Sequence, residues 1–244
     1  MGQPASRSTM SEPNVLNEER ERIGSGWGRG IDPMRFPAVK KFAGETVLDV
    51  GCGSGAYVEA LNNSGRRAVG LDVTYLNAWA SIKSCAVVGN ASSLPFSGGV
   101  FETVLALEVL EHCRDARRCL LEMARVASRN IIISVPDCKV PEECVRAGLV
   151  PHHWVDRSHC TLFTEDSIKS DIAAAGLKVA YFTRINATHP EILVLQAWPL
   201  MRIFEKPVCM IADWFTVRRI RRPLCGCMLI VAEKPDLMAQ QGGG

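Results

Sequence analysis

Seven apolar segments of strand length run along the chain, and segments with helical spacing lie between them. The predicted strands are 46–50, 67–71, 86–89, 101–107, 130–135, 178–182 and 228–232. The predicted helices are 56–61, 116–126 and 164–175. Near-continuous apolar strands that alternate with helices are typical of a parallel sheet covered on both faces. The sequence therefore predicts an α/β fold, doubly wound around a mostly parallel, seven-stranded sheet.

Three parts of the chain depart from this alternation. Residues 1–32 are polar, rich in Gly and Ser and aperiodic, which predicts a flexible N-terminal segment or a lid. Residues 33–235 form one predicted domain, which carries an insertion at about 186–224. Residues 236–244 are predicted to be a disordered tail.

Composition narrows the class of protein. A chain of 244 residues suits a single α/β domain, and its net charge of +2 predicts no attraction of the whole molecule to nucleic acid. No hydrophobic signal segment precedes the ten scattered cysteines, so reduced thiols and a cytoplasmic location are expected. No apolar run approaches the length that spans a bilayer.

A glycine-rich turn joins the first predicted strand to the first predicted helix. Gly51, Gly53 and Gly55 lie in this turn, and Asp72 ends the next strand. Ligands of open α/β sheets bind at such a carboxyl edge, where an aspartate can accept hydrogen bonds from ribose hydroxyls. The spacing Gly51-x-Gly53-x-x-Ala56 also fits the dinucleotide fingerprint, so an NAD-dependent oxidoreductase is one hypothesis.

Four motifs in order resemble those of class I S-adenosylmethionine-dependent methyltransferases. Residues 47–55 resemble the first motif, 90–96 the adenine-side segment, 101–112 the fourth strand with its following loop, and 121–136 the next helix and strand. The resemblance covers about 44–180 and the closing strand near Val231, and it implies a Rossmann-like methyltransferase fold.

The resemblance also implies a set of residues that bind the cofactor, S-adenosylmethionine. Asp49 and the glycines of the turn would contact the methionine part, Asp72 the ribose, Asn90 with Ala91 the adenine, and Glu108 would line the pocket. Asn90 stands where the family usually has Asp, so its contact to the adenine amino group loses a charge. The full predicted set is Asp49, Gly51, Cys52, Gly53, Gly55, Asp72, Val73, Asn90, Ala91 and Glu108.

Methyl transfer from a sulfonium needs an acceptor held in line and, for a hydroxyl, a base. Histidine is the natural base at neutral pH, and His112 and His159 follow the fourth and fifth predicted strands. Residues 151–164 resemble the same region of small-molecule O-methyltransferases. The sequence thus predicts transfer to a small-molecule acceptor, more specifically to a hydroxyl oxygen, with His112 or His159 as the catalytic base. A structural role for both histidines is the alternative.

The spacing Glu108-x-x-Glu111-His112 raises the alternative of a metal site. It resembles a metal-binding motif of small-RNA 2′-O-methyltransferases and of ubiquinone-pathway O-methyltransferases, in which a later histidine completes the set. His159 or His153 would take that part here. Glu and His ligands suit Mg²⁺, Mn²⁺ or Fe²⁺. The same pattern also lines cofactor pockets without metal, so no metal is the favoured prediction.

Other functions stay open at this stage. A metal-dependent RNA 2′-O-methyltransferase is one, although no RNA-binding module is recognisable and no nucleic-acid partner is expected. A non-catalytic cofactor-binding protein is another. The apolar and then Arg-rich stretch 192–222 is interpreted as a packed helical pair or substrate lid, or as a peripheral membrane contact.

Overall fold

The core of the molecule is one seven-stranded sheet with the order β3-β2-β1-β4-β5-β7-β6. In this computed structural model, residues 30–76, 79, 86–139, 142, 156–188, 207 and 224–235 are described. The strands are β1 Thr46–Val50, β2 Arg67–Asp72, β3 Ala86–Val88, β4 Phe101–Leu107, β5 Ala127–Pro136, β6 Lys178–Thr188 and β7 Leu224–Glu233. The first five strands are parallel, and β7 pairs antiparallel to both β5 and β6. The predicted fold class is confirmed.

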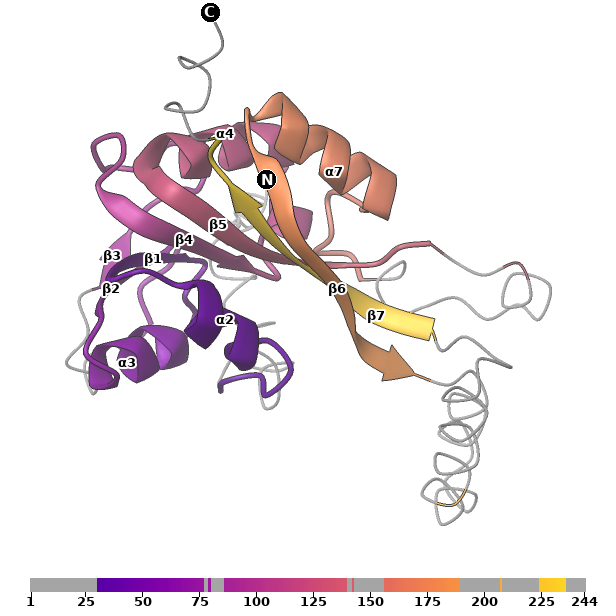
Figure 1. Ribbon diagram of the computed structural model, residues 1–244, viewed down its shortest axis with the longest axis horizontal. Coiled ribbons are helices and arrows are strands. Elements are labelled where there is room, and N and C mark those ends of the chain that lie inside the picture. Colours follow the sequence, from indigo (N-terminus) through magenta and orange to yellow (C-terminus); the bar gives the residue numbers. More distant parts are fainter. Residues whose placement is uncertain are drawn as a thin grey trace, which may run out of the picture.

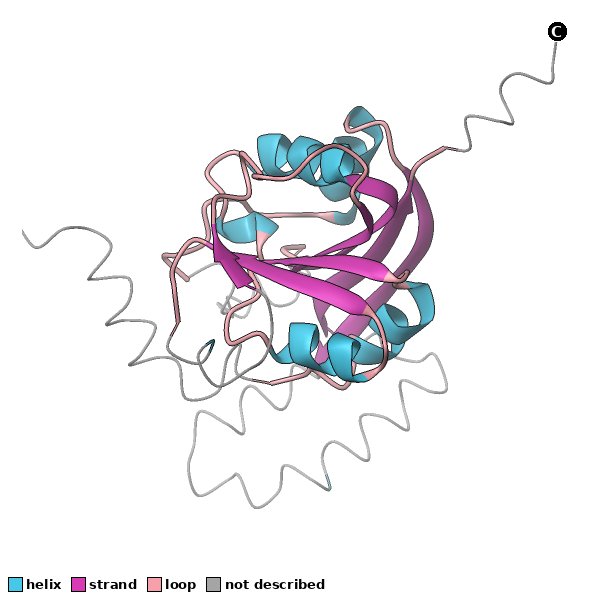
Figure 2. Ribbon diagram, turned by 90° about the vertical axis from the view of Figure 1, so that its left-hand side faces the viewer, coloured by secondary structure: helices cyan, strands magenta, loops and turns pink. Residues whose placement is uncertain are grey.

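Helices cover both faces of the sheet (Figure 1; Figure 2). Helices α2 and α3 lie on one face, and α4 and α7 lie on the other. Their bounds are α2 Phe36–Phe42, α3 Ala56–Asn63, α4 Ala116–Val126 and α7 Glu165–Ala174, and a 3₁₀ helix, η2, spans Leu110–His112. Because β2 and β4 lie on opposite sides of β1, the chain reverses its direction of winding there. The carboxyl ends of β1 and β4 therefore flank the crevice in which ligands of such sheets bind.

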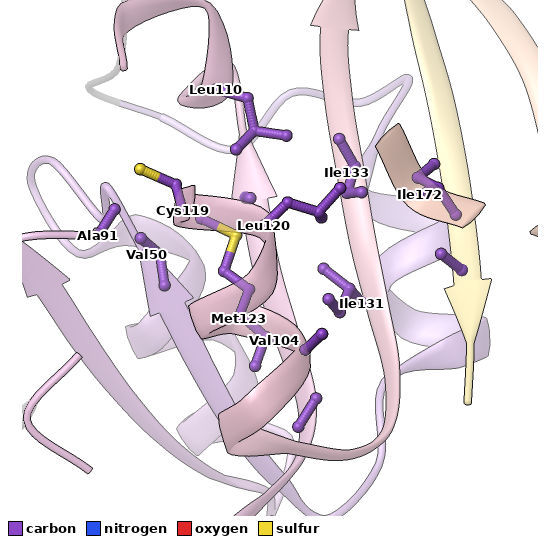
Figure 3. Packing of buried hydrophobic residues seen from close by; sticks show 14 of the residues in the cluster. Val50, Ala91, Val104, Leu110, Cys119, Leu120, Met123, Ile131, Ile133 and Ile172 are labelled. Carbon is purple, nitrogen blue, oxygen red and sulfur yellow. The ribbon is translucent and has the colours of Figure 1, made fainter. Parts of the chain in front are cut away.

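Each central strand is buried on both sides, which explains why it reads as continuously apolar. In β4, Val104 belongs to the hydrophobic cluster under α4 and α7, and its neighbour Leu105 belongs to the cluster under α2 and α3. Leu120 and Met123 of α4 belong to the first of these clusters, and Figure 3 shows Leu120 directed toward Ile133 of β5. Full burial of one such side chain stabilises the fold by about 1.5–3 kcal/mol.

Several predicted boundaries are corrected. The predicted strands 178–182 and 228–232 are longer in the structure: β6 continues to Thr188 and β7 begins at Leu224, because the two strands pair with each other over this length. Asp32, expected in the flexible lead-in, is anchored: its backbone N–H donates to the Tyr57 hydroxyl at 3.1 Å. Helix α2 was not predicted.

Three predictions lie outside the described residues. They are the flexible character of 1–29, the disordered tail 236–244, and the lid or membrane contact at 192–222, of which only residue 207 is described. Among the described helices, none is long and apolar enough to cross a membrane.

Candidate active site

The glycine-rich turn after β1 is held tightly against its neighbours. The backbone N–H groups of Gly51 and Cys52 both donate to the Leu71 carbonyl of β2, at 2.7 and 3.1 Å. Gly51 has φ +70°, and a Cβ there would lie 2.5 Å from a methyl carbon of Val109, in the loop after β4. A side chain is therefore excluded at Gly51 by conformation and by space, and the loops after β1 and β4 meet at the crevice.

Two aspartates, Asp49 and Asp72, lie close to this turn. Asp72 accepts a hydrogen bond from the Gly53 N–H at 3.0 Å, and the Trp79 indole donates to the Gly53 carbonyl at 2.7 Å. Asp49 is almost fully buried. Burial, and then the negative charge of Asp72, raise the pKa of Asp49 to about 7. The predicted residues Asp49, Gly53 and Asp72 are thus brought together at one edge of the sheet.

The side chains of three other predicted cofactor residues differ in exposure. Cys52 is buried, and a Cβ at Gly70 would lie only 2.7 Å from its sulfur. Ala91 is buried as well, whereas Val73 is exposed. The side chain of Val73 is therefore accessible to a ligand, whereas the side chains of Cys52 and Ala91 are enclosed by protein.

The segment that follows β3 forms a tight turn, and Glu122 and Arg125 of α4 form a clamp that holds it. Within the turn, the Ser93 N–H donates to the Asn90 carbonyl at 3.0 Å. Glu122 accepts from the Leu94 N–H at 2.9 Å, and Arg125 donates to the Leu94 carbonyl at 3.0 Å. The hydrogen bond from Arg125 lowers the pKa of Glu122 to about 2, so the carboxylate remains charged and the clamp stays ionic.

Glu108 stands at the carboxyl end of β4, in the left-handed backbone conformation with φ +57°. Its Oε1 accepts from the Ser134 hydroxyl at 2.9 Å and lies 3.1 Å from the Arg35 guanidinium. Arg35 is also paired with Asp32 at 2.9 Å. Burial acts to lower the pKa of Arg35, but the attraction of Glu108 and other neighbours outweighs it and raises that pKa, so the guanidinium stays charged.

Sequence reasoning missed Arg35. The available signal was the spacing Asp32-x-x-Arg35 immediately before an apolar and basic stretch, which places the two charges one helical turn apart.

Glu111, His112 and His159 come together beside this crevice. The N–H groups of Cys160 and Thr161 both donate to the Glu111 carbonyl, at 2.7 and 3.1 Å. These hydrogen bonds hold the segment after β5 against η2. As a result the rings of His112 and His159 have centroids 4.8 Å apart. The prediction that the two histidines share one site is consistent with this geometry, while His152 and His153 lie outside the described residues.

Each histidine has an oriented ring. His112 Nδ1 lies 3.2 Å from the Ser158 carbonyl oxygen, which can only accept, so Nδ1 carries the proton and Nε2 is the basic nitrogen of the neutral ring. His159 Nε2 lies 3.7 Å from Asp156, and Asp156 is held in turn by the N–H and hydroxyl of Ser158.

The carboxylate of Glu111 is buried in an unusual way. Only 1% of the residue is exposed, and neither carboxylate oxygen has a hydrogen-bond partner among the described residues. Burial, and then the nearby Glu108 carboxylate, raise the pKa of Glu111 well above its usual range. A buried carboxylate with unused acceptor capacity is a feature that a cation or a proton would satisfy.

The same residues fit a divalent cation. One ligand atom each from Glu111, His112 and His159 lie within 4.8 Å of one another. The contacts of His112 and His159 to Ser158 and Asp156 are the kind that orient metal-binding imidazoles. Glu108, expected as a fourth ligand, is not part of this group in the described residues, because Arg35 and Ser134 hold its carboxylate.

Comparison with known proteins agrees with this geometry. Residues 48–134 match the family model of a methyltransferase domain. A ubiquinone biosynthesis O-methyltransferase of Mesorhizobium japonicum is 33% identical over 112 residues, which are 42% of this chain and 43% of that protein. One from Chelativorans sp. is 31% identical over 173 residues, 65% of this chain and 66% of that protein.

Solved structures agree as well. A methyltransferase in complex with the Haloferax volcanii Trm112 methyltransferase activator superposes with a TM-score of 0.61 at 20% identity, over 93% of this chain and 100% of that one. In four of the curated relatives the match covers only 33% to 60% of the relative's length. The chain therefore contains a class I S-adenosylmethionine-dependent methyltransferase domain, and the dinucleotide interpretation of the glycine turn is set aside.

Proposed function

We propose that this chain transfers the methyl group of S-adenosylmethionine to a hydroxyl oxygen of a small molecule. The observation that carries the proposal is the oriented pair His112 and His159, which lies next to the crevice between β1 and β4. The two relatives named above are O-methyltransferases of ubiquinone biosynthesis, which supports a hydroxylated aromatic acceptor.

In the proposed site the glycine turn and Asp72 hold the cofactor, and Val73 contacts it from the exposed side. Methyl transfer breaks the S–CH₃ bond and forms an O–CH₃ bond, and the proton of the acceptor hydroxyl must leave. His112 takes this proton at Nε2, since Nδ1 is occupied by the Ser158 carbonyl. His159, paired with Asp156, orients the acceptor or the neighbouring ring.

A second role for these side chains is supported by the buried carboxylate of Glu111, whose oxygens have no hydrogen-bond partner among the described residues. Glu111, His112 and His159 would hold a divalent cation, and such a cation would supply Lewis acidity toward the acceptor hydroxyl. In that case His112 would serve as a ligand rather than as the base.

The test begins with calorimetry of the full chain with S-adenosylhomocysteine. The purified protein is then incubated with S-adenosylmethionine and a panel of catechols and demethylated quinols, and products are detected by mass spectrometry. We expect His112→Ala to lower turnover by about 10²–10⁴-fold while leaving S-adenosylhomocysteine affinity within about threefold. Cys160→Ser, an exposed neighbour, is the matched control. Full turnover in His112→Ala and in His159→Ala would refute the catalytic assignment.

A further inference from the structure

The side-chain oxygen of Asn90 is hydrogen-bonded within its own turn. Its Oδ1 accepts two hydrogen bonds at 2.9 Å, one from the Ser92 N–H and one from the Ser92 hydroxyl. A backbone N–H can only donate, so the atom that faces it must be the amide oxygen rather than the amide nitrogen. The orientation of the Asn90 amide is thereby fixed by the turn itself.

Because of these contacts, Asn90 offers a ligand a hydrogen-bond donor, whereas an aspartate would offer an acceptor. A carbonyl oxygen has two lone pairs, and Ser92 uses both. The remaining polar atom of the exposed side chain is Nδ2, which is a donor only. An aspartate in the same place would keep one oxygen on Ser92 and present its other oxygen as an acceptor.

Asn90 lies at the edge of the sheet where Asp72 ends β2. Asn90 follows β3, which pairs with β2 beside Asp72, and the Gly89 N–H donates to the Asp72 carbonyl at 2.9 Å. A ribose held by Asp72 places its base toward the β3 side, since the glycine turn of β1 occupies the other side. Asn90 is the first residue beyond β3 at that edge.

We propose that Asn90 reads a hydrogen-bond acceptor on the cofactor base through Nδ2, instead of accepting from the 6-amino group of adenine. The proposal rests on the proposed binding of S-adenosylmethionine. An acceptor is available at N1 of adenine and at the 6-oxygen of hypoxanthine. The Ser92 contacts thus fix the direction of the amide donor that Asn90 offers to either base.

The test compares two ligands, S-adenosylhomocysteine and its 6-oxo analogue S-inosylhomocysteine, by calorimetry. The measured quantity is the ratio of their dissociation constants in the wild type and in Asn90→Asp. Aspartate keeps the turn because one oxygen still accepts from Ser92, but its second oxygen attracts a 6-amino group and repels a 6-oxygen. We expect Asn90→Asp to shift the ratio toward the adenine ligand by about tenfold or more.

Asn90→Ala separates base recognition from support of the turn. It removes the turn contacts, so it should weaken both ligands to a similar extent and leave the ratio nearer to that of the wild type than Asn90→Asp does. If Asn90→Asp binds S-adenosylhomocysteine with an unchanged ratio, Asn90 has only a structural role and the inference is overturned. If the wild type binds neither ligand, the proposed function itself fails, and the inference with it.

Discussion

Arg35 and Glu108 form an ion pair of 3.1 Å that joins the start of helix α2 to the carboxyl end of β4. Both side chains are largely buried, with exposures of 13% and 19%. The pair connects a residue far from the family motifs to the edge where the glycine turn and η2 meet. Helix α2 is thus part of the support of the site and not only a cover for the sheet.

Arg35→Met should therefore destabilise the fold. It leaves the Glu108 carboxylate partly buried with the Ser134 hydroxyl but without its cation, which we expect to cost about 1–3 kcal/mol of unfolding free energy. Urea denaturation of Arg35→Met, Glu108→Gln and the double variant measures the coupling between the two residues. Lys40→Met, at an exposed position of α2, is the control and should change stability by less than about 0.5 kcal/mol. Additive effects of the two substitutions would contradict the pairing.

Asp49 predicts a specific dependence of stability on pH. Its pKa is about 7 in the folded protein, above the usual value of 3.8, so between these values the folded state binds more protons than the unfolded state. Stability should then fall as pH rises from about 4 to about 7, by up to about 1.4 kcal/mol per pH unit from this group.

Asp49→Asn removes this titration, so the variant should gain stability relative to the wild type across the same interval. Denaturation curves at four pH values between 4.5 and 7.5 measure the difference. Asp166→Asn, on the exposed side of α7, provides the control. Parallel pH profiles for Asp49→Asn and the wild type would show that Asp49 is already ionised in the folded protein.

Sequence patterns predicted those elements whose stability is local or whose burial is complete. The bounds of β4 and α4 agree with the predicted 101–107 and 116–126, because β4 is almost entirely buried and α4 has buried residues in each of its turns. Helix α2 was missed because only Ala38 and Val39 of its seven residues are buried. The ends of β6 and β7 were missed because they are stabilised by pairing with each other rather than by an apolar sequence.

The candidate site was predictable in its residues but not in its contacts. His112 and His159 follow parallel strands, so a shared edge of the sheet was expected. The hydrogen bond from the Cys160 N–H to the Glu111 carbonyl sets the distance between the two rings. It depends on backbone geometry that no residue pattern encodes. The polarity of Asn90 likewise depends on which lone pairs Ser92 uses.

The clamp that Glu122 and Arg125 of α4 form on the turn after β3 should be important for stability. Glu122 is 8% exposed and accepts from the Leu94 N–H, so Glu122→Gln breaks a charge-assisted contact and is expected to cost about 1–3 kcal/mol. Arg118 lies 3.9 Å from the same carboxylate and is mostly exposed, so Arg118→Ala should cost less than about 1 kcal/mol. Urea unfolding at pH 7 compares the two variants. Equal losses of unfolding free energy in Glu122→Gln and Arg118→Ala would mean that the clamp contributes no more to stability than the exposed contact of Arg118.

The divalent-cation role of Glu111, His112 and His159 makes a prediction that needs no acceptor. Paramagnetic resonance detects free Mn²⁺, so titration of the full chain with Mn²⁺ measures binding directly. If these residues hold a cation, the wild type binds Mn²⁺, and Glu111→Gln weakens binding by about tenfold or more, because the buried carboxylate is the only charged ligand of the three when both imidazoles are neutral. Asp156→Asn, which acts through His159, should weaken binding less than Glu111→Gln, and Cys160→Ser should leave it unchanged. Wild-type binding no tighter than that of Glu111→Gln would contradict the cation role of these three residues.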